Sequence, residues 1–311
     1  MSEFDPHSPQ MQELIAATLA GAPAVIGRLD ALTASASGAG VRAARLRLLV
    51  ALVNVRRLAE ARELVAREGW ESESFAQQPA RSNVPLNRFE IDALFALGVM
   101  DNEPGGNATL ARRRFTRATT LMRPAPGGEV DASFWSAVHG TVITSDRLGD
   151  FPASAEALLL AFQAAGCDLA MMPAELAALW PDRARDQYVR LVLSGESEKA
   201  RAFVAIPGIA ALLDAASAGQ ATNVAVARAQ LEASPGGDPV RARRHFQELR
   251  EALDESHHLF WPALRGELAA IARVEGEAAA ASLARELLVG RDPATVPHDL
   301  AARARGGDVK S

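Results

Sequence analysis

The chain of 311 residues has few aromatic residues, one cysteine and almost no lysine. Aromatic residues make up 5 % of it, so its core must be built mostly from Ala, Leu and Val, which favours closely packed helices over a β-sandwich. The single cysteine, Cys167, excludes an intramolecular disulfide and any zinc site with several cysteines. Only Lys199 and Lys310 among the 33 basic residues are lysines, a bias that we interpret as typical of a GC-rich bacterial genome.

The sequence also lacks the features of several other protein classes. No apolar stretch approaches the roughly 20 residues that a membrane-spanning helix needs, and the acidic N-terminal stretch MSEFDPHSPQ does not resemble a secretory signal. The net charge of −5 argues against a general nucleic-acid binder. The motifs GxSxG, GxGxxG and HExxH and the P-loop are absent. We therefore expect a cytoplasmic protein that binds no membrane, no nucleic acid, no cofactor and no metal.

What the sequence does contain is helical periodicity along most of its length, interrupted by proline and glycine. We expect a flexible lead at 1–9, one helical domain at 10–290 and a loose or briefly helical tail at 291–311. The polar segment 71–84 is the alternative point of division. The predicted helices cover 10–19, 23–32, 41–53, 58–67, 85–100, a segment around 111–118, 132–144, 154–165, 183–193, 197–205, 209–216, 222–233, a segment around 242–249, 261–274 and 277–288.

One pattern recurs along these helices. In the stretch ARRRFTRA, the small residues Ala111 and Ala118 share a helical face with Phe115, because steps of three and four residues nearly complete whole turns. Small residues let a neighbouring helix approach closely, and the ring fills the space that remains. The first small position of each copy falls at 61, 111, 158, 200, 242 and 281, so successive copies are 39 to 50 residues apart. Such a recurrence is typical of stacked helical units.

The pattern resembles the tetratricopeptide repeat, a helix–turn–helix unit of 34 residues. The best-matching unit contains Leu97, Gly98, Ala111, Phe115, Ala118 and Pro124. Later units share a glycine five residues before an alanine, at Gly195 and Ala200, Gly237 and Ala242, and Gly276 and Ala281. The chain departs from the family in its longer spacing and in the missing first-helix aromatic. The resemblance implies an all-α fold, a right-handed α-solenoid of about six antiparallel helical hairpins.

The same resemblance implies a binding function and no catalysed reaction. Similar proteins bind a peptide or a protein surface in the concave groove lined by first helices, so we expect a binding adaptor or scaffold in a bacterial cytoplasm. Polar residues of the predicted first helices are the candidate contacts to the partner. They are Asn54, Asp92, His139, Arg185, Gln187, Arg190, Arg228 and Arg273.

Two arginine clusters on predicted second helices suggest a site for an acidic partner, because the guanidinium fork matches a carboxylate or phosphate. They comprise Arg112, Arg113, Arg114 and Arg117, and Arg241, Arg243 and Arg244. The alternative interpretation of both clusters is a solvated outer helix face.

Two further functions stay open at this point. A self-assembling scaffold would dock its terminal repeats on another copy. An all-α enzyme or regulatory subunit would hold its site at a helix junction, near His139 or near His257 and His258. Asp254 and His258 are four residues apart, a helical spacing that metal sites use, but no third ligand lies nearby in the sequence.

Overall fold

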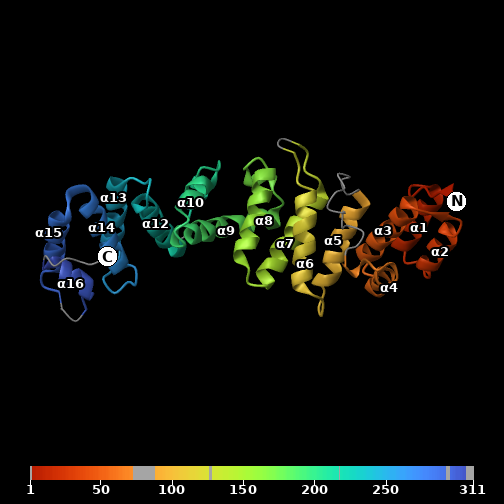
Figure 1. The fold of residues 1–311 in the computed structure, drawn as a ribbon, viewed down its shortest axis with the longest axis horizontal. Coiled ribbons are helices and arrows are strands. Elements are labelled where there is room, and N and C mark those ends of the chain that lie inside the picture. Colours follow the sequence, from red (N-terminus) through yellow and green to blue (C-terminus); the bar gives the residue numbers. More distant parts are fainter. Residues whose placement is uncertain (1, 73–87, 126–127, 217, 292–294, 306–311) are drawn as a thin grey trace. The chain divides into compact units, whose positions relative to one another are not determined.

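The computed structural model describes residues 2–72, 88–125, 128–216, 218–291 and 295–305. Within these ranges the protein consists of sixteen α-helices, two short 3-10 helices and a single pair of two-residue strands, so the all-α prediction is confirmed (Figure 1). The chain divides into unit 1, Met1–Ala178, and unit 2, Leu179–Ser311. The boundary lies inside one helix, and the predicted alternative at 71–84 falls mostly outside the described residues.

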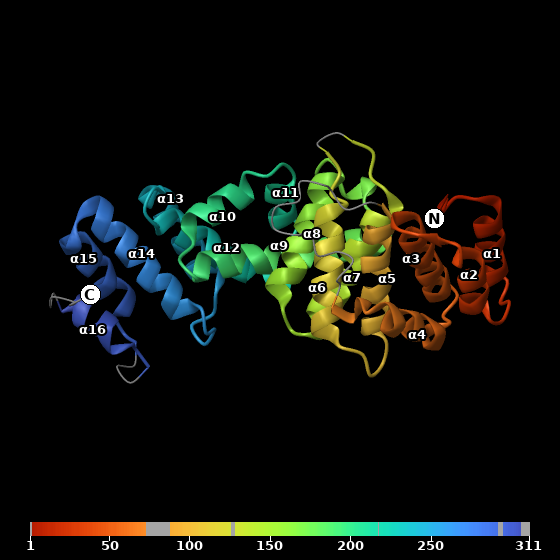
Figure 2. The ribbon, with the colours of Figure 1, turned by 45° about the vertical axis from the view of Figure 1, so that its right-hand side comes forward.

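In unit 1 the helices α1, α3 and α5 each contact both the next helix along the chain and the one after it. The odd-numbered helices α1, α3, α5 and α7 therefore pack side by side in this order, and α6 lies against both α5 and α7 (Figure 2). The elements are β1 (Ser2–Glu3), α1 (Pro9–Leu19), α2 (Val25–Thr33), β2 (Ala36–Ser37), α3 (Ala39–Asn54), α4 (Leu58–Glu68), η1 (Trp70–Ser72), α5 (Arg88–Asn102), α6 (Ala108–Leu121), α7 (Ala132–Arg147), α8 (Phe151–Ala164) and η2 (Leu169–Met171).

Unit 2 repeats this arrangement of contacts. Helix α13 lies against α12 and α14, α12 also touches α14, and α15 joins α14 to α16. The elements are α9 (Ala174–Leu193), which crosses the boundary between the units, α10 (Ser197–Val204), α11 (Ile209–Asp214), α12 (Ala218–Ala233), α13 (Pro239–Ala252), α14 (Phe260–Glu275), α15 (Glu277–Leu288) and α16 (His298–Ala304).

Polar side chains fix where several helices begin. The side chain of Asn107 accepts a hydrogen bond from the Leu110 amide at the start of α6, and Asp131 and Asp150 cap α7 and α8 in the same way. Asp238 accepts from the Val240 amide at the start of α13. These caps satisfy amides that have no partner inside a helix, and they place the predicted turns between helices.

Phenylalanine rings seated on glycine backbones join neighbouring helices in the core. Phe115 is buried between Gly98 of α5 and Gly140 of α7, where an added methyl group would lie 2.8 Å and 2.7 Å from its ring carbons. In unit 2 the Phe246 ring lies against Gly266 in the same manner. The prediction that rings and small residues share a buried face is therefore confirmed around Phe115 and Phe246.

The structure corrects the sixth copy of the pattern and one helix boundary. Ala280 and Ala284 are fully buried in α15, whereas Ala281 is only half-buried, so the small position was placed one residue too late. Helix α9 begins at Ala174 rather than at Arg183 and contains Pro181. Burial of the adjacent Trp180, whose ring meets Phe203 edge-on at 6.2 Å, offsets the lost backbone hydrogen bond there.

The first and last described segments of the chain make contacts within their own units. In the segment predicted as a lead, β1 pairs in parallel with β2, and Ser8 caps α1. In the predicted tail, α16 buries Leu300 against α14 and α15. Asp299 of α16 accepts two hydrogen bonds from Arg265 of α14, at 2.7 and 2.8 Å. The tail is briefly helical, as expected, and it covers the last helices of unit 2.

Candidate binding grooves

Unit 1 carries a groove of about 200 Å³ on α1, α3 and α5, which we call the unit 1 groove. Its apolar lining includes Leu19, which is 52 % exposed, together with Val50 and Phe89. Its polar lining is Arg47, Asn54 and Asp92. An exposed leucine beside a few polar groups on a concave surface is typical of a binding site, because the apolar side chain gains from being covered and the polar groups fix orientation.

The charges around Asp92 are set by one arginine. Arg88 Nε donates to Asp92 Oδ1 at 2.8 Å, and Arg88 Nη1 donates to Asp131 at 2.8 Å. Burial raises the pKa of Asp92 above its ordinary value, against the lowering effect of Arg88. The hydrogen bonds from Arg88 and from the Ser133 amide lower the pKa of Asp131 to about 2. The unit 1 groove therefore has a partly desolvated carboxyl group at its edge.

Unit 2 carries a second groove of about 390 Å³ on α9 and α12, which we call the unit 2 groove. Its apolar lining is Val189, Leu193 and Val224, and Leu193 is 63 % exposed. Asp186, Arg190 and Asn223 are among its polar residues. Each groove thus combines an exposed leucine and valine with one asparagine, one aspartate and one exposed or half-buried arginine. The two grooves share these five residue types, while Phe89 lines only the unit 1 groove, and Arg185, Ser194 and Gln220 line only the unit 2 groove.

The grooves bring together four of the eight predicted partner contacts. Asn54 and Asp92 line the unit 1 groove, and Arg185 and Arg190 line the unit 2 groove. Arg185 is buried, and its guanidinium donates to the Leu212 and Ala215 carbonyls, to Asp182 and to Gln220. It holds α9 against α11 and α12, so its assignment as a partner contact is corrected to a structural one.

The other four predicted contacts lie outside both grooves. Gln187 accepts from Arg190 at 3.2 Å, and His139 is half-buried on α7. Arg228 bonds Asp214 at 2.7 Å, and Arg273 donates to the Ala233 carbonyl.

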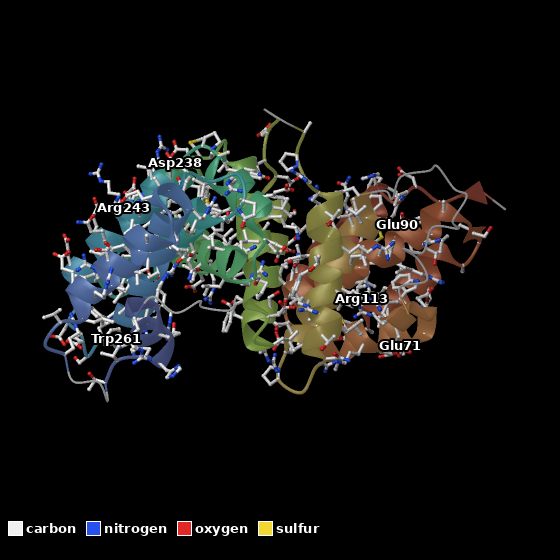
Figure 3. The ribbon with its side chains drawn as sticks, turned by 60° about the vertical axis from the view of Figure 1, so that its left-hand side comes forward. Glu71, Glu90, Arg113, Asp238, Arg243 and Trp261 are labelled. Atoms are coloured by element: carbon white, nitrogen blue, oxygen red, sulfur yellow. The ribbon has the colours of Figure 1, made fainter. Side chains whose placement is uncertain are left out.

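The first arginine cluster divides by environment. Arg114 is buried, pairs with Asp101 and donates to the Glu71 carbonyl at 2.8 Å, so it cannot reach a partner. Its position on the Phe115 side of α6 explains the difference from the sequence-based expectation. Arg112 pairs with Asp150 and, with Arg113 and Arg117, lines a hollow of about 680 Å³ between α6 and the start of α8. Arg113 is labelled in Figure 3.

The second arginine cluster belongs to unit 2 and consists of ion pairs. Arg243 of α13, labelled in Figure 3, pairs with Glu275 of α14. Arg244 Nε lies 2.8 Å from Glu248, which is also on α13. Arg241 Nε is 3.5 Å from Asp238, the residue that caps α13. Each positive charge in this cluster therefore faces a carboxylate of the chain itself.

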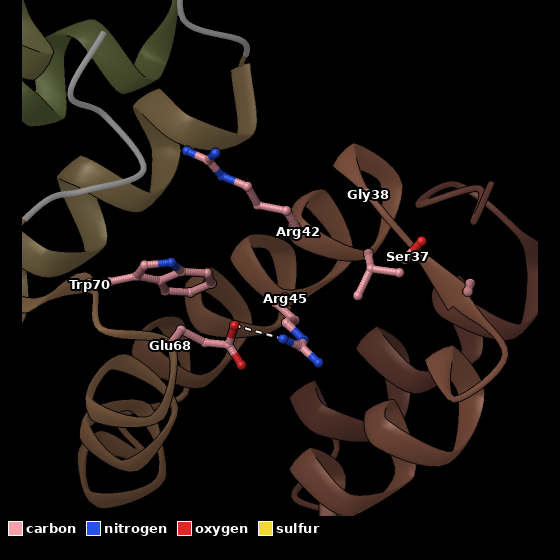
Figure 4. Close-up of a pocket in the computed structure, with 8 residues that line it drawn as sticks. Ser37, Gly38, Arg42, Arg45, Glu68 and Trp70 are labelled. Atoms are coloured by element: carbon pink, nitrogen blue, oxygen red, sulfur yellow. Dashed lines mark hydrogen bonds and ion pairs between the residues drawn. The ribbon is translucent and has the colours of Figure 1, made fainter. Parts of the chain in front are cut away.

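A further hollow in unit 1, of about 390 Å³, is likewise neutralised. Within it Arg45 is bonded to Glu68 at 2.7 Å, while Arg42 extends away and its Nη2 lies 3.1 Å from Glu90 Oε1 (Figure 4). Trp70 forms one wall and is buried. With each arginine beside a glutamate, the hollow has no charge excess that would select an anion.

The histidine cluster near the start of α14 does not support the metal alternative. Residues 253–259 form a turn between helices, so Asp254 and His258 do not share a helical face as their spacing suggested. Asp254 accepts from the Ser256 amide at 2.8 Å, and His257 Nδ1 accepts from the Leu259 amide at 3.2 Å. Among the described residues, no three His, Cys, Asp or Glu side chains are placed to hold a metal ion.

Sequence reasoning missed the apolar part of both grooves. Leu19 and Leu193 each end a helix just before a glycine-containing turn, at positions where a buried leucine and an exposed one look alike in sequence. Asn223 of α12 and Arg47 of α3 were missed because their neighbours across the groove come from other helices. A leucine as the last residue of a helix, directly before a glycine-containing turn, was the one available signal.

Comparison with known proteins gives no family model, no curated protein and no solved structure that matches this chain. Within the described residues, no helix combines the length and apolar character that crossing a membrane requires.

Proposed function

We propose that this protein is an adaptor that binds extended segments of a protein partner in the unit 1 and unit 2 grooves. Its helices would form antiparallel hairpins of a right-handed, tetratricopeptide-like solenoid, acting in a bacterial cytoplasm. The observation that carries the proposal is the repetition of one set of groups, an exposed leucine with valine, asparagine, aspartate and arginine, in both grooves.

The pattern of long-range contacts supports the repeat architecture. Arg88 reaches Asp131 over 43 residues, Arg112 reaches Asp150 over 38 and Arg273 reaches the Ala233 carbonyl over 40. These separations are close to the 39 to 50 residues between copies of the sequence pattern. Contacts of each repeat with its neighbour are what a solenoid requires.

The chemistry of the grooves favours a peptide as the ligand. The exposed Leu19 and Leu193 would each cover an apolar side chain of the partner, and burying a leucine contributes about 1.5–3 kcal/mol. Asn54 and Asn223 carry both an amide donor and a carbonyl acceptor, which matches the two polar groups of a peptide bond. A rigid helical surface keeps the ordering cost on the protein side low.

A display library of random dodecapeptides, selected on the immobilised full-length protein, tests the proposal. We expect selected peptides to bind in fluorescence anisotropy and to lose about tenfold in affinity, or about 1.4 kcal/mol, when Leu19→Asp or Leu193→Asp removes the apolar anchor of their groove. The control is Leu148→Asp, since Leu148 is 40 % exposed and lies outside both grooves. Failure to select any peptide, or equal loss in the control, would refute the proposal.

A further inference from the structure

The face of α3 that leads into the unit 1 groove is already occupied by the protein's own N-terminal segment, residues 4–8. At Gly40 the backbones meet so closely that an added methyl group would overlap the Phe4 carbonyl. A glycine is therefore required at this position for the segment to lie on α3. Ahead of it, β1 pairs with β2 and fixes the direction in which the segment runs.

Two side chains that line the unit 1 groove also contact the N-terminal segment. Arg47 donates from Nη1 to the Pro6 carbonyl, and the His7 ring lies 5.3 Å from the Phe89 ring. Both Arg47 and Phe89 line the unit 1 groove, and the Arg47 guanidinium carbon lies 5.8 Å from the centre of the Phe89 ring. One group thus binds a backbone carbonyl and the other a ring, as they would in an extended ligand.

The positions along α3 form one continuous face. Residues 40, 47, 50 and 54 are separated by seven, three and four residues, which places them in a line along the helix. The N-terminal segment covers the line from Gly40 to Arg47, and the groove continues from Arg47 to Asn54. Arg47 stands where the two halves meet.

Only Phe4 of the segment packs against the core cluster of unit 1, and the rest of the segment lies at the surface. Phe4 and Pro6 are half-buried, and Asp5 and His7 are exposed. The helix beneath it, by contrast, buries Ala44 and Leu48 completely. Segments with few buried contacts open at low free-energy cost, so this occupant can leave without unfolding unit 1.

We infer that residues 4–8 are an exchangeable occupant of the α3–α5 face, displaced by a partner segment that is extended and carries a ring for Phe89 beside a carbonyl for Arg47. This inference rests on the proposed function of the unit 1 groove. The partner segment can bind only in those molecules in which residues 4–8 have left the face. Residues 4–8 therefore act as an intramolecular competitor of the partner.

The test uses the octapeptide MSEFDPHS, labelled with fluorescein, as a probe of the full-length protein in fluorescence anisotropy. In a triple variant, Phe4→Gly with Pro6→Gly and His7→Gly, the segment loses its side-chain contacts and gains backbone freedom, so it should leave the face more readily. This variant should bind the probe at least tenfold more tightly than wild type. Adding Gly40→Ala should abolish that binding. The matched control, Gly27→Ala, has open space around it and should not. Equal binding to wild type and triple variant, or binding that survives Gly40→Ala, would overturn the inference.

Amide hydrogen exchange gives a second readout should the triple variant not fold. In the wild type the His7 and Ser8 amides donate to Asp5, at 2.8 and 3.1 Å. Gly40→Ala in the otherwise unchanged chain should raise their exchange rates at least tenfold, and Gly27→Ala should leave them unchanged. Unaltered rates in both variants would contradict docking of the segment on α3.

Peptides selected from the library separate the two proposals. Tighter binding of these peptides to the triple variant than to wild type supports competition with the N-terminal segment. Equal binding to both proteins overturns competition while the proposed function stands. If the proposed function fails instead, no library peptide binds either protein, even though the probe MSEFDPHS still distinguishes them.

Discussion

Gly140→Ala is a small change that tests the packing of unit 1 directly. Gly140 lies in the middle of α7, where its backbone contacts the buried Phe115 ring. The new methyl group would lie 2.7 Å from ring carbons Cγ and Cδ1. The ring cannot move away from the new methyl group, because Gly98 of α5 lies on its other side. A methyl group added at Gly98 would lie 2.8 Å from Phe115 Cε1.

Two effects of opposite sign set the magnitude. Alanine is favoured over glycine inside a helix by up to about 1 kcal/mol, while overpacking a well-filled core costs about 1–3 kcal/mol. The net effect in wild type is therefore smaller than the steric term. Replacing Phe115 by Leu removes the obstacle, so the same Gly140→Ala change should then stabilise the protein. The coupling between the two positions should be about 1–3 kcal/mol.

Urea unfolding followed by far-ultraviolet circular dichroism measures all members of this cycle. Gly27→Ala in α2 is the matched control, because Gly27 is exposed and nothing lies within 4 Å of an added methyl group. We expect Gly27→Ala to be neutral or stabilising and Gly140→Ala to be less stable than it. Two results together would refute the packing of the Phe115 ring between Gly98 and Gly140. They are equal stability of the Gly140→Ala and Gly27→Ala proteins and a coupling between Gly140→Ala and Phe115→Leu below about 0.5 kcal/mol.

Three further predictions concern charge and the C-terminal helix. Glu267→Ala should cost about 3–5 kcal/mol in urea unfolding, because it removes the buried carboxylate to which Arg250 donates at 2.7 Å and leaves Arg250 only a 3.4 Å contact with the exposed Glu251. A double Arg250→Met, Glu267→Leu variant should recover much of the loss. Asp131→Asn should reduce stability by at most about 1 kcal/mol near neutral pH. Because the folded pKa of Asp131 is about 2, below its ordinary 3.8, the difference from wild type should vanish as the pH falls from about 4 towards 2, and a constant difference would contradict this ion pair. Leu300→Ala should lower the stability of unit 2 by about 2–5 kcal/mol in the same unfolding assay, and a cost below about 0.5 kcal/mol would show that α16 is not docked.

The helices could be predicted from the sequence because their signals are local. Asn107 and Asp238 cap helices where the sequence places turns, and the spacing of Ala111, Phe115 and Ala118 marks a buried face without further information. The glycine partners of the rings could not be found in this way. Gly140 and Gly266 contact rings that lie on other helices, so only the folded chain brings each pair together.

The candidate site was less accessible to sequence reasoning than the fold. Half of the predicted contacts reach a groove, since the choice of first-helix polar residues selects roughly the correct helices. The pattern could not separate Arg185, which is buried, from Arg190 five residues later, which lines the same groove at its surface. Arg185 is buried because α11 and α12 pack against it, and the sequence periodicity of α9 does not predict where those two helices lie.

The arginine bias of the chain has a consequence for how its helices are held together. Arg185 makes three hydrogen bonds to two other helices and the turn that follows one of them, and a fourth to Asp182 of its own helix. Arg201 bonds both the Leu231 carbonyl and the Ser234 hydroxyl, 30 and 33 residues away. A planar guanidinium with five donors can bridge two elements at once, which the point charge of lysine does less well. With aromatic residues at 5 %, arginines supply many of the links between neighbouring helices within each unit. A basic cluster in such a chain therefore indicates a junction between helices before it indicates a ligand. The proposed recognition is left to the grooves, where Leu19, Leu193, Asn54 and Asn223 are exposed.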